Sequence, residues 1–247
     1  MALTLFLLGC ILVVAHTAET FLGFGSTLIA LAFGVYLLPL NILLPMLVIL
    51  GLLQSIWLVS RWFRYVDWRK LFFFILPLAA VGLLIGIISR GIANKDVLKI
   101  VLGVFIIVVS SAELALLYIR KTPGGRLHWY YRVSLLIGGG FFHGLFATGG
   151  PPIVYYANRE FRDQMYLRAT LSMLWLILNI GLLIGFLLGR QINIQILEMT
   201  AWVLPGFILG IILGSLIRVK EFSFKVLAHS LLFCAGMFLL IQTLGKT

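Results

Sequence analysis

Charged residues are scarce in this chain. Asp, Glu, Lys and Arg together make up 11% of its 247 residues, whereas apolar and aromatic types make up 62%. The surface of a soluble domain of this length needs far more polar groups than that. The scarcity therefore excludes an ordinary soluble domain. Because a lipid bilayer accepts so apolar a chain, we predict an all-α polytopic membrane protein.

Cysteine and enzyme motifs are equally rare. Cys10 and Cys234 lie inside apolar runs, without the spacing of a metal site or a disulfide framework. We expect both to be buried small apolar side chains. The motifs of phosphate-binding loops, zinc proteases and serine hydrolases are absent, as is a soluble segment large enough to bind ATP. We therefore expect no enzyme activity, no metal and no cofactor, so any work on a solute must draw on ion gradients or the membrane potential.

Acidic residues are also few. Eight Asp and Glu stand against nineteen Lys and Arg, a formal net charge of +11. In a soluble protein this balance would suggest nucleic-acid binding. Here the basic residues fall in short gaps between apolar runs, where loops meet anionic headgroups. The expected partner is therefore the lipid bilayer and not nucleic acid, and the aromatic residues beside these gaps read as interfacial anchors: Trp62, Trp68, Trp129, Tyr130 and Tyr131.

The apolar sequence divides into ten runs, with two glycine-rich breaks. Glycine weakens a helix and proline removes a backbone donor, so both breaks should interrupt a helix. The first break includes Glu19 and the stretch Gly23 to Thr27, and the second is Thr148 to Pro152. The runs are 3–18, 26–38, 42–60, 71–89, 97–118, 133–147, 150–157, 169–189, 199–217 and 226–243.

The two halves of the chain repeat one another. Pro77 recurs as Pro205 at an offset of 128, and the same offset relates three further pairs: Gly82 with Gly210, Gly86 with Gly214, and Arg90 with Arg218. An offset of 127 carries His16 to His143. We predict two membrane repeats, 1–118 and 133–247, joined by a basic cytoplasmic linker at 119–132.

The distribution of basic residues predicts how the repeats are oriented. If each repeat has about five helical elements, the second is inverted, and fourteen of the nineteen Lys and Arg residues share one side. With four elements each, the repeats are parallel and the split is ten to nine. The positive-inside rule favours the inverted arrangement, with both termini outside the bacterial inner membrane. The charge distribution is the same whether the broken elements that open each repeat cross the membrane or turn back within it as re-entrant hairpins, so this question stays open.

Inverted repeats with breaks at matching positions indicate a binding site between the halves. Helices that start after the breaks would present N–H groups and positive dipole ends to an anion, and the hydroxyls would add donors. Amides in the middle of corresponding runs could line the same site. The candidate binding residues are Gly23, Gly25, Ser26, Thr27, Thr148, Gly149, Gly150, Pro151, Gln54 and Asn179.

Three ionisable residues are candidates for coupling transport to protons. His16 and His143 form a matched pair beside the breaks, and a histidine can donate to an anion or carry a proton. Glu19 is an acid at apolar depth, which is costly and therefore typical of a functional residue. Glu113 is a second acid of this kind.

A known family shares this pattern. The Leu-Pro…Gly…Gly pattern in both halves, and the stretch Gly138-Gly139-Gly140 to His143-Gly144 followed by Thr148-Gly149-Gly150-Pro151-Pro152, resemble the TauE/SafE (TSUP) family of sulfite exporters. The resemblance covers 5–243. It implies export of sulfite, sulfoacetate or a related organosulfonate from bacteria. The first break departs from the family pattern because it contains no proline.

Our main hypothesis is a secondary transporter, an exporter that works by alternating access. Its substrate would be sulfite, thiosulfate or an organosulfonate, coupled to H⁺ or Na⁺. The alternatives are an anion channel, a sodium- or proton-coupled cation carrier that uses Glu19, and a membrane assembly factor without a substrate. A channel needs a continuous polar path, whereas the polar residues here are confined to the breaks. The sequence leaves open whether the protein forms a homodimer.

Overall fold

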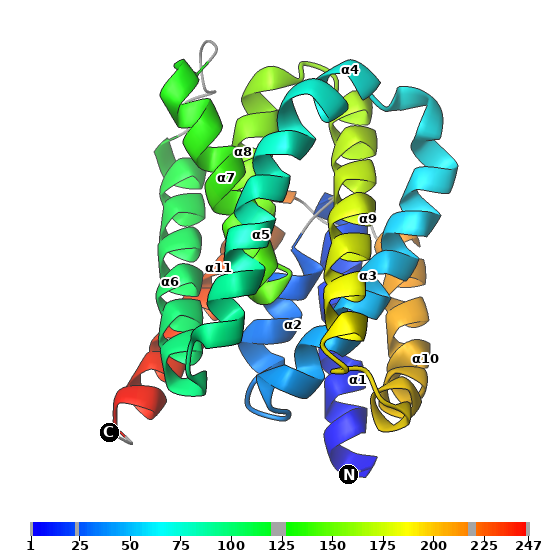
Figure 1. Ribbon diagram of the computed structural model, residues 1–247, viewed down its shortest axis with the longest axis vertical. Helices are drawn as coiled ribbons and strands as arrows, with labels where there is room; N and C mark the ends of the chain where they lie inside the picture. The colour runs from blue at the N-terminus through cyan, green and yellow to red at the C-terminus, as the bar shows by residue number, and fades with distance from the viewer. Residues whose placement is uncertain (1, 23–24, 120–126, 217–220, 246–247) are drawn as a thin grey trace.

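The computed structural model describes residues 2–22, 25–119, 127–216 and 221–245, and these residues form a bundle of helices (Figure 1). The first half of the chain contains α1 (Ala2–Leu22), α2 (Ser26–Gly34), α3 (Leu40–Trp62), η1 (Phe63–Tyr65), α4 (Trp68–Lys70), η2 (Leu71–Ile75), α5 (Leu76–Ile92) and α6 (Lys95–Ile119). The second half contains α7 (Trp129–Phe146), α8 (Gly150–Glu160), α9 (Gln164–Leu188), α10 (Ile194–Leu216) and α11 (Glu221–Leu244).

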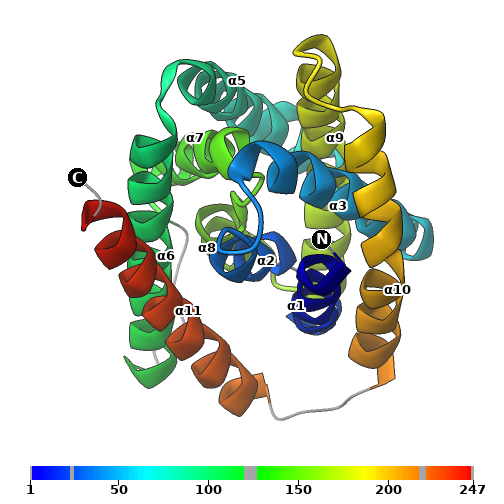
Figure 2. The same ribbon diagram turned by 90° about the horizontal axis from the view of Figure 1, so that it is seen from below.

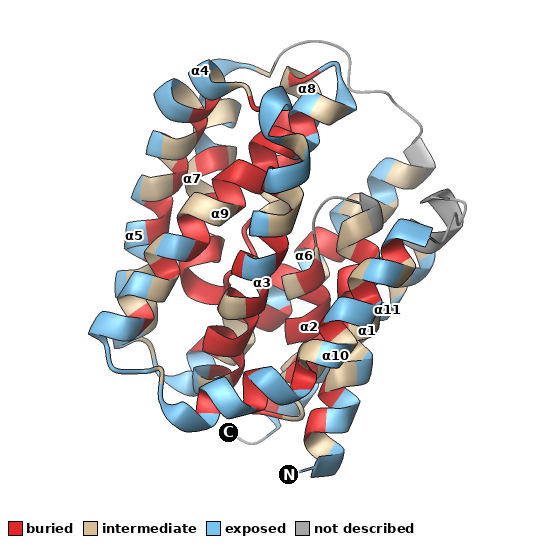
Figure 3. Ribbon diagram, turned by 90° about the vertical axis from the view of Figure 1, so that its right-hand side faces the viewer, coloured by how far each residue is buried: buried red, intermediate tan, exposed pale blue. Residues whose placement is uncertain are grey.

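The outside of the bundle is apolar. In the described part of the chain, seven helical segments are long and apolar enough to cross a membrane. Exposed residues follow the outer faces of the helices (Figure 3), and large apolar side chains are among them, with Phe73 84% and Trp202 76% exposed. So extensive an apolar surface would be unstable in water, whereas lipid covers it. The prediction of an all-helical, multi-pass membrane protein is therefore confirmed.

The prediction that the two cysteines are buried is wrong. Cys10 and Cys234 are exposed, although the sequence predicts that they are buried. Their apolar neighbours in the sequence indicate a membrane helix, but such a helix needs to bury only the face that packs on other helices. An apolar run therefore does not say which of its side chains face protein and which face lipid.

Two helix pairs turn back inside the bundle. In Figure 1, α1 rises from the end where both termini lie and α2 returns toward that end, whereas α7 and α8 make the opposite excursion from the other end. We call α1–α2 the first hairpin and α7–α8 the second hairpin. Seen along the bundle, α2 and α8 lie in the middle, surrounded by longer helices (Figure 2). The short helices α2 and α8 therefore lie inside the protein.

The repeated glycines lie where helices of the two halves pack closely. A Cβ atom at Gly82 of α5 would stand 2.0 Å from the carbonyl oxygen of Ile137 in α7. A Cβ atom at Gly210 of α10 would stand 2.8 Å from the carbonyl oxygen of Val13 in α1. Gly86 and Gly214 are similarly crowded. Small residues at these positions let the backbones approach, as they often do in membrane helix pairs.

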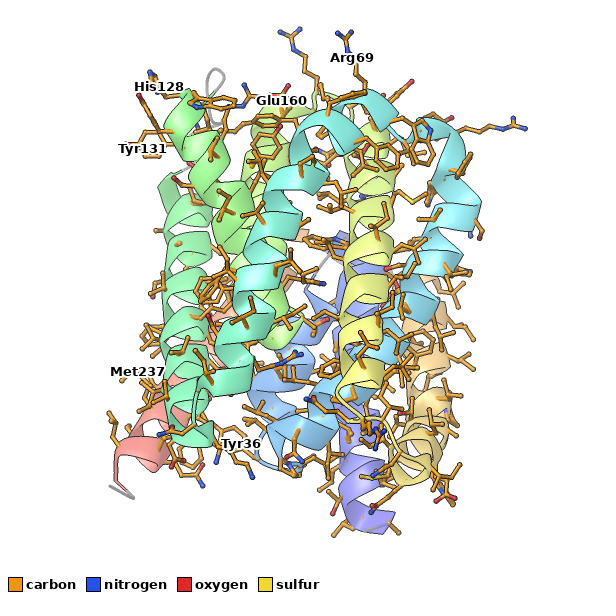
Figure 4. The ribbon with its side chains drawn as sticks, viewed as in Figure 1. Tyr36, Arg69, His128, Tyr131, Glu160 and Met237 are labelled. Carbon is orange, nitrogen blue, oxygen red and sulfur yellow. The ribbon has the colours of Figure 1, made fainter. Side chains whose placement is uncertain are left out.

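Polar residues in the loops cap the N-terminal ends of the helices that follow them. The side chains of Asp67, Asn94, Asp163 and Asn193 each accept a hydrogen bond from a backbone N–H in the first turn of α4, α6, α9 or α10. Arg69, His128, Tyr131 and Glu160 lie at the end of the bundle opposite the termini (Figure 4). α7 begins at Trp129, so the last residues of the predicted linker 119–132 are helical, while 120–126 lie outside the described residues.

Candidate functional site

Residues beside the two hairpin turns and in the middles of α3 and α9 line a cavity of about 40 Å³. Polar side chains from both halves of the chain line this cavity, and small and apolar residues form the rest of its wall. We call it the hairpin cavity, and it is lined by Glu19, Gly25, Thr27, Leu28, Gly51, Ser55, His143, Ala147, Thr148, Gly150, Pro151, Trp175 and Asn179.

The second hairpin is a tight turn with strained backbone. Ala147 has φ +55°, a left-handed conformation that is uncommon for a residue with a side chain, and its N–H donates to the His143 carbonyl at 2.7 Å. Gly149 has an ordinary φ, but a Cβ atom there would stand 2.0 Å from the Gly139 carbonyl oxygen. α8 then begins with Pro151 and Pro152 in its first turn, where a missing N–H costs little. This turn places Thr148 and Gly150 on the cavity wall.

His143 brings unpaired polar atoms to the cavity. Its side chain is 3% exposed, and neither ring nitrogen makes a hydrogen bond of standard geometry among the described residues, although the side chain of Asn179 lies close enough to interact with the ring. The ring stacks on Trp175, with centroids 5.4 Å apart and planes 24° apart. A buried polar group without a partner costs about 1–3 kcal/mol, and such groups are rare in proteins. Because His143 lines the cavity, a small polar ligand there would satisfy it.

The first hairpin carries its own anion. Glu19, near the end of α1, accepts a hydrogen bond from the N–H of Ser26 at 3.1 Å and a second from the Ser26 hydroxyl. Ser26 is the first residue of α2, so the carboxylate occupies the N-terminal end of that helix. Gly25 precedes it with φ +103°, which favours glycine although a Cβ atom would meet nothing within 4 Å. The two donors of Ser26 are therefore already bonded within the hairpin.

Behind the cavity wall, His16 has a partner. Its Nδ1 donates to Oε1 of Gln54 in α3, and its ring meets Phe207 edge-on with centroids 4.6 Å apart. Both His16 and Gln54 are buried. Neither side chain lines the cavity, so this pair links α1 to α3.

Comparison with known proteins identifies the family. A family model described as sulfite exporter TauE/SafE matches residues 7–239, nearly the whole chain. The chain belongs to the TauE/SafE family. No curated protein and no solved structure matches it. Because TauE/SafE is a family of membrane transporters, the match agrees with the absence of enzyme motifs.

Most of the residues predicted from the sequence come together in this TauE/SafE protein. Eight of them line the hairpin cavity, namely Gly25, Thr27, Thr148, Gly150, Pro151, Asn179, Glu19 and His143. Ser26 contacts the cavity residue Glu19, whereas His16 and Gln54 pair behind the wall and Gly149 packs on Gly139. Glu113 on α6 does not line the cavity, and Gly23 lies outside the described residues.

Other lining residues of the TauE/SafE cavity escaped the sequence analysis. Ser55 follows Gln54 directly, and Gly51 lies one helical turn before Ser55. Trp175 lies one turn before Asn179. Residues four apart share a face of a helix, so this spacing would have indicated both Gly51 and Trp175 once Ser55 and Asn179 were placed. Serine and tryptophan within a membrane helix carry no such signal alone.

Several of the lining groups can donate hydrogen bonds to a small oxyanion. Thr27, Ser55 and Thr148 bring hydroxyls, Asn179 an amide and His143 a ring nitrogen, and all of these can donate hydrogen bonds. Glu19 is the only acid among the described lining residues, and none of those residues is Lys or Arg. The described residues contain no group of three or more His, Cys, Asp or Glu that could hold a metal ion.

Proposed function

We propose that this TauE/SafE protein is a secondary transporter that exports a small sulfur oxyanion, such as sulfite or thiosulfate, by alternating access. The anion binds in the hairpin cavity. The observation that carries the proposal is the buried His143, whose ring nitrogens have no partner among the described residues, beside the hydroxyl of Thr148. A cavity of about 40 Å³ favours a compact inorganic anion over an organosulfonate with a longer carbon chain.

Alternating access would use two inverted repeats, α1–α6 and α7–α11. Three observations support the proposal that the second repeat is an inverted copy of the first. Both repeats open with a hairpin, both termini lie at one end of the bundle, and each half lends one helix to the other, since α5 packs on α7 and α10 on α1. The hairpins would be re-entrant, because α2 and α8 turn back inside the bundle. Two such bodies can rock about a site between them.

The basic loops would face the cytoplasm. Arg69 and His128, from two of the loops that the sequence places on the basic side, lie at the same end of the bundle (Figure 4). The positive-inside rule then puts both termini outside the inner membrane. Export therefore runs from the end with Arg69 toward the end with the termini.

Glu19 would couple anion binding to a proton. Its carboxylate holds the donors of Ser26 and also lines the cavity. A substrate anion in a cavity of this size would lie close to that carboxylate, and two negative charges repel strongly at low dielectric. Protonation of Glu19 removes the repulsion. We therefore propose that one proton binds together with each anion.

One observation also favours a second candidate function. The Glu19 carboxylate and the neighbouring oxygens of Ser26 and Thr27 are ligands that a sodium ion accepts, so a cation carrier would use the same cavity. In a cation carrier, sodium would bind without any anion, and binding would depend on Glu19 rather than on Thr148.

The test is ligand binding to the purified protein, by calorimetry or thermal shift, with sulfite, thiosulfate, sulfate, sulfoacetate, chloride and sodium. We expect one sulfur oxyanion to bind, and Thr148→Val to weaken it by about 10- to 100-fold, because the variant loses a hydrogen bond to a charged group. Thr200→Val is the matched control, since Thr200 bonds within its own helix to Ile196 at 2.7 Å. Binding of sodium alone, abolished in Glu19→Gln, would instead establish the cation carrier.

A further inference from the structure

A second, larger pocket opens at the end of the bundle that carries the termini. It encloses about 540 Å³ between the ends of α5, α6 and α9 and the turn from α2 to α3. None of its lining residues lines the hairpin cavity. We call it the basic pocket, and its lining residues are Val35, Pro39, Leu40, Asn41, Leu44, Ile87, Arg90, Gly91, Ala93, Lys95, Leu98, Lys99, Gly185, Phe186 and Gln191.

Three cations converge on the basic pocket. Arg90 comes from the end of α5, and Lys95 and Lys99 come from the first turns of α6. None of the described residues that line the pocket is acidic, whereas Asn41 and Gln191 add neutral amides. Like charges gathered in one pocket repel one another, so an anion bound among them would stabilise the arrangement.

Arg90 is the cation of this group whose contacts are described in most detail. Its guanidinium stands 4.3 Å from the ring centre of Phe186, which is itself 1% exposed. The Nη1 atom of Arg90 is buried and has no hydrogen-bond partner among the described residues. The aromatic face orients the guanidinium, but a ring offers no acceptor for its N–H groups. A planar guanidinium with an unpaired buried donor is well suited to bind an oxyanion through two hydrogen bonds.

The remaining walls of the pocket are apolar. Ile87, Leu98 and Leu44 lie on three different helices around it, and the pocket is more than ten times larger than the hairpin cavity. It also lies where two predicted membrane spans, Trp68–Ile92 and Lys95–Leu117, end beside each other. Lipid headgroups lie at the ends of membrane spans, so the cations gathered at this end can attract the anionic headgroups of the leaflet that meets it.

We propose that the basic pocket binds an anionic phospholipid. The phosphate lies among Arg90, Lys95 and Lys99, and an acyl chain follows the apolar wall. A free oxyanion would satisfy the same cations but would leave most of the apolar wall without a partner. Because the pocket joins α5 and α6 of the first half to α9 of the second, a bound lipid would also influence how the two halves move relative to each other.

The experiment measures lipid binding to the full-length protein in a neutral detergent. Phosphatidylglycerol is compared with phosphatidylcholine, inorganic phosphate and sulfite by titration and by native mass spectrometry. We expect phosphatidylglycerol to bind more tightly than phosphatidylcholine, and Arg90→Gln to weaken it about fivefold, as expected for one cation at a charged membrane surface. Arg69→Gln makes the same chemical change at the opposite end and should leave binding unchanged (Figure 4).

Three results would overturn the proposal: equal binding of the two phospholipids, unchanged binding in Arg90→Gln, or binding of free phosphate or sulfite with the same dependence on Arg90. The last result would assign the pocket to free oxyanions. If Arg90→Gln does not fold, Lys99→Gln replaces it with the same expected loss. Because the readout is lipid binding and not transport, the outcome is independent of the substrate proposed for the hairpin cavity.

Discussion

The two hairpins occupy corresponding places in the two halves, yet their polar groups are arranged differently. In the first hairpin, Glu19 is bonded to Ser26, and His16 is bonded to Gln54. In the second hairpin, the ring nitrogens of His143 have no partner among the described residues. Nε2 of His16 and Nε2 of Gln54 also have no partner among the described residues, but these atoms lie behind the cavity wall. The two hairpins therefore differ in where their unpaired nitrogens lie, since those of His143 belong to a residue that lines the cavity.

A single position accounts for much of this difference. The offset of 127 that relates His16 to His143 also relates Glu19 to Phe146, which is fully buried. The first half thus has a carboxylate where the second half has an apolar ring. Under the proposed function, the first half would supply the coupling group and the second half most of the donors for the substrate.

The largest effect is expected from removing the carboxyl group of Glu19, which distinguishes the first hairpin from the second. If one proton binds with each anion, affinity for the anion rises as the pH falls, by up to about tenfold per pH unit. Glu19→Gln should abolish that dependence and hold the affinity at its low-pH level. Calorimetry from pH 6 to pH 8 with thiosulfate, which does not titrate in this range, measures it. Glu113→Gln should retain the wild-type slope, and a slope that survives in Glu19→Gln would contradict proton coupling through this residue.

The packing of the two halves offers the next comparison. Gly82→Ala should destabilise the protein by about 1–3 kcal/mol, because the added methyl group meets a backbone oxygen that cannot easily move. Gly210→Ala, at the matching position of the second half, should cost less, since its nearest oxygen is 2.8 Å rather than 2.0 Å away. Melting temperatures of the purified variants measure both. Gly138→Ala is the control, because its Cβ atom would meet nothing within 4 Å, and equal losses at Gly82 and Gly210 would show that the two contacts are equally tight.

The two histidines provide the smallest and most specific test. His143→Phe should weaken anion binding by about tenfold, because phenylalanine keeps an aromatic ring but has no donor to face the ligand. His16→Phe should change the affinity little, since His16 does not line the cavity, and should lower the melting temperature because phenylalanine cannot replace its hydrogen bond to Gln54. Parallel calorimetry and melting curves separate the two effects. Equal losses of affinity would mean that the two hairpins share the ligand symmetrically.

Much of the site could be predicted because polar and ionisable side chains, which are costly to bury in a membrane, are conspicuous in an apolar sequence. Glu19, His143 and Asn179 are conspicuous within membrane runs, and all three line the hairpin cavity. Ser55 and Trp175 were missed because serine and tryptophan are ordinary in such runs. Cys10 was expected to be buried and is exposed, since hydrophobicity does not distinguish a lipid-facing side chain from a protein-facing one.

By itself, the sequence determined the membrane environment, the helical class and the family, because each depends on local composition, on spacing or on a pattern repeated along the chain. Only the tertiary structure decided that Ser26 bonds to Glu19, that His143 remains unpaired, and that Arg90 meets Phe186 beside two lysines. These contacts join residues on different helices, and their geometry depends on how the helices pack around the two hairpins. Spacing along one helix carries no information about that packing.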